Sequence, residues 1–171
     1  MMRKTTLVAI VVAALVAGGC GSSNSSSSSS AGGSAAGSTT GGVKLAKTKF
    51  VLHAGLAFGA FHRYIYKPVK AGNLAHPLRH KLTLVKAALA AAFVYHELKL
   101  ALKDAQADPK LSKLVAPLTA LQAKFSGLGD KLKSGNASPA DITQTNTDIG
   151  SISQQSSSNG QPITEQVPSH L

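Results

Sequence analysis

Apolar side chains recur at spacings of three and four along much of the chain, which is the period of an amphipathic α-helix. The clearest example begins at Asp108, and its large apolar residues are Leu111, Leu114, Leu118, Leu121, Phe125, Leu128 and Leu132. Asp108 followed by Pro109 is a typical helix start, because aspartate caps free amide groups and proline suits the first helical position. We expect Pro117 to kink this helix and Gly127 to weaken its end.

An earlier helix is predicted over residues 49 to 67, ended by Pro68 and by Gly72 a little further on. One face of this helix carries the apolar positions Val51, Ala54, Phe58, Phe61 and Ile65. Gly55 and Gly59 lie beside that face. Their Gly-xxx-Gly spacing allows another helix to approach closely, so both are candidates for helix packing.

The longest predicted helix has Pro77 in its first turn and continues to about Ala107 without a glycine or another proline. It carries two apolar stripes. One consists of Leu78, Leu82, Val85, Leu89, Phe93, His96 and Leu100, and the other of Leu84, Ala88, Ala91, Tyr95, Leu98 and Leu102. Because both stripes are apolar, we expect neighbours on at least two sides and a central position in the fold.

A fourth, marginal helix is predicted from Ser138 to about Ser153, with Pro139 and Asp141 in its first turn. Its many Thr, Ser, Gln and Asn residues favour loose packing or fraying. No stretch alternates like a strand. The predicted body, residues 43–155, is therefore all-α: an irregular antiparallel bundle of three long helical segments and the marginal fourth. The polar tail, residues 156–171, is expected to be disordered.

The first nineteen residues have the layout of a secretory signal peptide: a basic start, an apolar run over residues 7–16 and three small residues before Cys20. The apolar run is too short for a lasting membrane span, which needs about twenty residues. The sequence Ala17-Gly18-Gly19-Cys20 resembles the lipobox of bacterial lipoproteins, although Ala17 stands where that family usually has leucine. The alternative is an ordinary free cysteine after a secretory signal.

The resemblance covers residues 1–20 only, and it concerns location. It implies that the Cys20 thiol carries diacylglycerol, that cleavage occurs before it, and that the new amino terminus is often acylated. Two or more acyl chains hold a protein stably on a membrane. The resemblance therefore implies a protein anchored to the cell membrane on its extracytoplasmic side, in a leaflet that the sequence leaves open.

Residues 20–42 form the predicted connection between anchor and body. This stretch is rich in Ser and Gly and contains no large apolar residue, so it is expected to be a flexible linker. A flexible coil of this length has a mean reach of about 25 Å. The body is therefore expected to sample the nearby membrane surface.

The charge of the chain is strongly positive, +11 overall. Removal of the signal takes away Arg3 and Lys4 and leaves sixteen basic and seven acidic residues, with all the bases before residue 134. Such a body attracts polyanions, and the nearest ones to a lipid-anchored protein are lipid head groups and charged envelope polymers. Another envelope protein is a further possible partner, and nucleic acid is not expected. The simpler interpretation is that the lysines solvate helix faces.

Candidate chemistry is sparse. Use of the single cysteine for lipid leaves none for a disulfide, a thiolate metal site or a nucleophile. His76 and His80 are four residues apart and are candidate metal ligands. His96 is a candidate to pair with His53 or His62 across a helix interface around haem. His96-Glu97 begins the zinc-protease pattern, but Leu100 occupies the second histidine position. With no suitable carboxylate pair or phosphate-binding loop, we expect no enzyme activity and no cofactor.

Three functional hypotheses follow from the sequence. The first is a non-catalytic envelope lipoprotein, a binding or structural module with a basic surface. The second is a carrier of a small molecule, haem or metal that uses histidines between helices. In the third, residues 50–61 lie in the membrane interface and support a membrane complex through Gly55 and Gly59. The oligomeric state is open, because the leucine seam can pair within or between chains.

Overall fold

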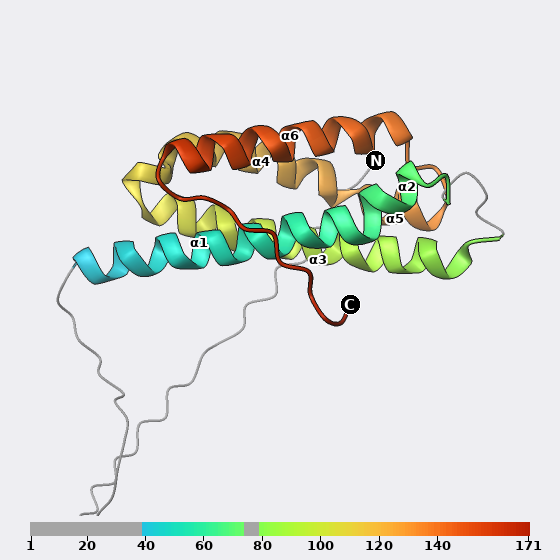
Figure 1. The fold of residues 1–171 in the computed structure, drawn as a ribbon, viewed down its shortest axis with the longest axis horizontal. Helices are drawn as coiled ribbons and strands as arrows, with labels where there is room; N and C mark the ends of the chain where they lie inside the picture. Colours follow the sequence, from blue (N-terminus) through green and yellow to red (C-terminus); the bar gives the residue numbers. More distant parts are fainter. Residues whose placement is uncertain (1–38, 74–78) are drawn as a thin grey trace, which may run out of the picture. The chain divides into compact units, whose positions relative to one another are not determined.

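The computed structural model describes residues 39–73 and 79–171. These residues are helical with no strand among them, which confirms the predicted all-α fold. Helices α1 (Thr39–Phe61) and α3 (Lys81–Ala107) pack as an antiparallel pair (Figure 1). None of the described helices combines the length and the hydropathy that crossing a bilayer requires.

The first helical segment is longer than predicted. It begins at Thr39, and after Phe61 it continues through a π-helical turn, η1 (His62–Tyr66), into the short helix α2 (Lys67–Lys70). The expectation that Pro68 ends the helix was wrong. Pro68 lies in the first turn of α2, directly after the π-helical turn, where its missing amide hydrogen costs no α-helical hydrogen bond. The segment ends at Gly72, whose φ is 73°, so the second of the two predicted stop signals is confirmed.

Helix α3 is central, as predicted, and contacts α1, α4 and α5. It starts at Lys81, later than the expected start at Pro77, which lies outside the described residues. Only one of its two stripes is covered. The buried side is rich in small residues that allow close helix packing, namely Ala87, Ala88, Ala90, Ala91, Ala101 and Ala105. The expectation that both stripes face neighbours was therefore wrong.

The leucine seam forms the opposite wall of the core. Asp108 accepts a hydrogen bond from the Lys110 amide at 2.9 Å, which confirms the predicted cap. The chain then forms a 3₁₀ turn, η2 (Pro109–Leu111), and helix α4 (Ser112–Ser126). At Gly127 the helix is interrupted, and α5 (Leu128–Lys133) follows. All seven large apolar residues of the seam are buried: Leu111, Leu114, Leu118, Leu121, Phe125, Leu128 and Leu132.

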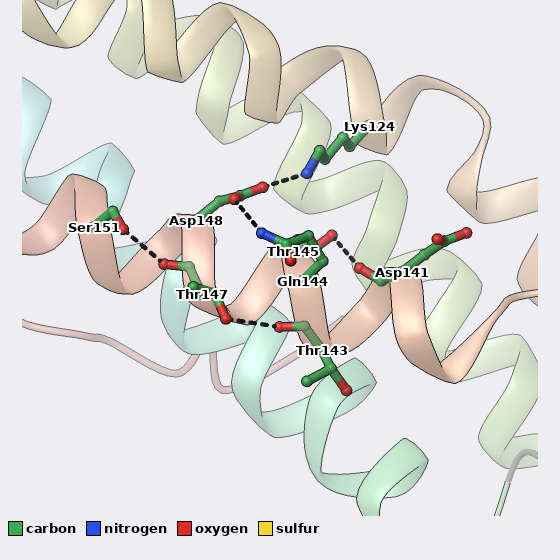
Figure 2. Close-up of polar contacts among 8 residues, drawn as sticks. All are labelled: Lys124, Asp141, Thr143, Gln144, Thr145, Thr147, Asp148 and Ser151. Atoms are coloured by element: carbon green, nitrogen blue, oxygen red, sulfur yellow. Dashed lines mark hydrogen bonds and ion pairs between the residues drawn. The ribbon is translucent and has the colours of Figure 1, made fainter.

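Helix α6 (Pro139–Ser158) packs against α4 and is longer and better packed than expected. Its stripe of Ile142, Thr145, Ile149 and Ile152 is buried. The hydroxyl groups of Thr145, Thr147 and Ser151 each donate to the carbonyl four residues earlier, as Figure 2 shows. Asp148 bonds both Gln144 and Lys124 of α4 (Figure 2). The polar residues are therefore satisfied locally, while the apolar stripe supplies the packing.

The C-terminal segment, expected to be disordered from residue 156, has a defined path in the structure. Gly160, with φ 73°, ends α6 and turns the chain back. Residues 161–171 then run in an extended conformation along α1 (Figure 1). Ile163 packs against the core and is partly buried. We call residues 161–171 the C-terminal strap.

Candidate functional site

The structure describes only some of the residues singled out by the sequence. Cys20 and His76 lie outside the described residues. His80 is at the N-terminal cap of α3, and His96 is exposed on the same helix. Sixteen helical residues separate them by about 24 Å, so they cannot share one metal ion or haem. Within the described ranges, no group of three or more His, Cys, Asp or Glu side chains is placed to hold a metal.

Two other histidines have the most developed polar surroundings, and the first of them is His53 of α1. Its Nδ1 atom lies 2.7 Å from Oε2 of Glu97, and its Nε2 atom lies 4.0 Å from Oδ2 of Asp104. Burial raises the pKa of the Asp104 carboxyl group, and the positive charges of His53, Lys49 and Lys103 oppose that rise. This cluster joins α1 to α3.

The raised pKa of Asp104 makes a prediction for stability. A carboxyl group whose pKa is higher in the folded state binds its proton more tightly there, so its contribution falls as pH rises from the ordinary pKa through the raised one. Asp104→Asn resembles the protonated form. We expect the variant to be more stable than the wild type at neutral pH, with the difference vanishing in acid. Urea unfolding across the pH range measures this, and a wild-type advantage that grows with pH contradicts it.

His62, in the π-helical turn, connects three distant parts of the chain. Its Nδ1 atom lies 2.7 Å from Oε2 of Glu165 in the C-terminal strap, and its Nε2 atom lies 2.6 Å from Oδ1 of Asn146 in α6. Nearby, the Tyr64 hydroxyl donates to the Pro168 carbonyl at 3.2 Å. These contacts hold the strap against η1.

Gly55 and Gly59 provide the close approach that their spacing predicted, but the segment that approaches is the strap instead of a helix. The Gln166 amide donates to the Gly55 carbonyl at 3.0 Å. A Cβ atom on Gly55 would lie 2.3 Å from the Thr164 carbonyl oxygen, and one on Gly59 would lie 2.2 Å from that of Gln166. Both positions therefore require glycine for the strap to lie where it does.

The charges of the body are distributed unequally between exposed and paired positions. Most of the acidic side chains face a basic one: Glu97 and Asp104 with His53, Asp108 with Lys47, Asp148 with Lys124, and Glu165 with His62. The lysines on α3, by contrast, are exposed, and the two acids of that helix, Glu97 and Asp104, face His53. The excess of basic over acidic residues in the sequence therefore lies at the protein surface.

The uncovered side of α3 combines this charge with apolar side chains. Leu82, Val85 and Leu89 are 68%, 52% and 49% exposed, and exposed Ala92 and His96 continue the same spacing. We call these five residues the outer face of α3. Exposed Lys81 and Lys86 flank it on opposite sides of the helix. The sequence identified this stripe as apolar but assigned it to the core.

Comparison of the chain with models of known protein families, with curated proteins and with solved structures finds no match. Function is therefore argued from the surface that the residues form.

Proposed function

We propose that the protein is a lipid-anchored protein of the cell envelope, a non-catalytic helical module that binds anionic surfaces through its basic body. The observation that carries this proposal is the distribution of charge, because the acids are largely paired while lysines such as Lys81, Lys86 and Lys99 are exposed. The lipobox-like sequence ending at Cys20 supports the anchor and the extracytoplasmic location.

The two alternative functions gain no support from the arrangement of the side chains. A haem carrier needs histidine nitrogens that converge, whereas the ring nitrogens of His53 face Glu97 and Asp104 and those of His62 face Glu165 and Asn146. A membrane-interface helix over residues 50–61 needs exposed apolar side chains. In the fold Phe50, Phe58 and Phe61 have no exposed surface and belong to the core, and among the large apolar side chains of this stretch only Leu52, at 41%, is exposed.

The anchor is tested by intact mass and membrane fractionation of the full chain expressed in bacteria. The wild type is expected to begin at Cys20, to carry a lipid mass increment and to sediment with membranes. Cys20→Ala is expected to lack the lipid increment, because the thiol is the attachment point. Ser22→Ala, two residues away, is the matched control and should behave like the wild type. An unmodified Cys20 in the wild type would reject the anchor.

The anionic-surface part of the proposal has a separate test. The test uses a chain that starts at Gly21. This chain lacks the lipid-bearing cysteine and retains every described residue. Its binding to vesicles containing phosphatidylglycerol and to a soluble anionic cell-wall polymer is measured over a salt series. We expect binding at low salt that weakens as salt screens the lysines. Binding to neither at low salt would reject this part.

A further inference from the structure

We propose that the outer face of α3 is a membrane-docking surface that lies in the head-group region of an anionic bilayer. The proposal rests on the proposed function, since it identifies which part of the basic body meets the anionic surface. An apolar stripe bordered by lysines is the pattern of helices that lie in the plane of a membrane interface. Here the pattern is displayed by a helix whose other side is fixed in the core.

The apolar component is a continuous row at helical spacing. Leu82, Val85 and Leu89 remain about half exposed or more, although the opposite side of the same helix is fully packed. The row therefore adds nothing to the core. Burial of such side chains among lipid acyl chains is favourable for the same reason that core burial is.

The charge on this face fits anionic lipid. Helix α3 contains two acids, Glu97 and Asp104, and both face His53 of α1, at 2.7 Å and 4.0 Å. Lys81 and Lys86 lie on either side of the row, so their ammonium groups can reach phosphates while their methylene chains cover apolar surface. On the adjacent α5, Oδ1 of exposed Asp130 lies 3.7 Å from Nζ of Lys133, so this lysine compensates the negative charge of Asp130.

The same charges argue against a second copy of the chain as the occupant of this face. In a two-fold symmetric dimer the same patch lies on both sides of the interface. Lys81 and Lys86 of one copy would then lie close to the lysines of the other, without an acid on the outer face to compensate them. A lipid surface supplies the missing negative charge.

The experiment places a reporter on the face, which is practicable because the chain contains no tryptophan. Leu89→Trp is made in the lipidated protein and reconstituted into phosphatidylglycerol vesicles that contain brominated lipid. Gln154→Trp, exposed on α6, is the matched control. We expect quenching several-fold stronger at position 89 than at 154. Equal quenching at the two positions overturns the proposal while leaving the anchor intact.

A second measurement does not depend on the anchor. In the chain starting at Gly21, the triple change Leu82→Gln, Val85→Gln and Leu89→Gln is expected to weaken vesicle binding roughly tenfold with unchanged helicity. If the triple variant binds vesicles as the wild type does, the lysines act elsewhere on the body. In that case the docking face is wrong and the proposed function stands. If instead the triple change abolishes self-association seen by sedimentation, the occupant is a second copy and the membrane proposal is overturned.

Discussion

Replacement of Phe61 by alanine is expected to lower the free energy of unfolding by about 3–5 kcal/mol, because it removes a fully buried aromatic ring and leaves a cavity. The ring lies at the end of α1, where the α-helix passes into the π-helical turn. It meets Phe125 edge-on with centroids 5.8 Å apart and stacks against Tyr66 at 6.1 Å. These contacts join the first helical segment to α4. Urea unfolding followed by circular dichroism measures the loss.

Leu82→Ala is the matched control for this change. It also truncates a large apolar side chain to alanine in a helix, but Leu82 is 68% exposed and contributes little to the core. We expect its free energy of unfolding to lie within about 0.5 kcal/mol of the wild type. Equal losses in the two variants would mean that the assignment of buried and exposed positions is incorrect.

Several features of the fold that depend on local sequence were predicted correctly. The cap at Asp108 and the helix start at Ser138 involve residues two or three positions apart, so their chemistry is visible in a short window. The leucine seam was also predicted, because seven residues at one spacing leave a single apolar face. These signals are sufficient for an all-α bundle.

The choice between the two stripes of α3 was not predictable in the same way. Both are apolar, and hydropathy favours the leucine-rich stripe that contains Leu82 and Leu89. The structure buries the alanine-rich side, since small residues let α1 and α4 approach closely. The sequence does indicate which side of α3 is buried, because the alanines are concentrated on that side. Alanines favour burial here because they let helices pack closely, more than because they are hydrophobic.

The polar contacts of the candidate site were missed because they join residues far apart in the chain. His62 and Glu165 are separated by 103 positions, and His53 and Glu97 by 44. No local pattern distinguishes these histidines from solvated ones. The glycine spacing was visible, but it could not identify what approaches, since a helix and an extended strap both benefit from missing side chains.

Gly59→Ala is expected to release the C-terminal strap from α1. The added Cβ would lie 2.2 Å from the Gln166 carbonyl oxygen and 2.6 Å from its carbonyl carbon, which are backbone atoms that cannot rotate away. The strap must therefore move, and the hydrogen bond from the Gln166 amide to Gly55 is lost with it. Hydrogen exchange followed by mass spectrometry should show much faster exchange in residues 161–168 with unchanged protection in α4.

Gly150→Ala is the matched control for the effect of Gly59→Ala on the free energy of unfolding. Alanine in place of a helical glycine normally stabilises by roughly 0.5–1 kcal/mol. At Gly150, in α6, a Cβ meets nothing within 4 Å, so the full gain is expected there. At Gly59 the same gain is opposed by loss of the strap contacts, including those of Glu165 and Pro168 with η1. If both variants gain equally and the strap retains its protection, its docking on Gly55 and Gly59 is excluded.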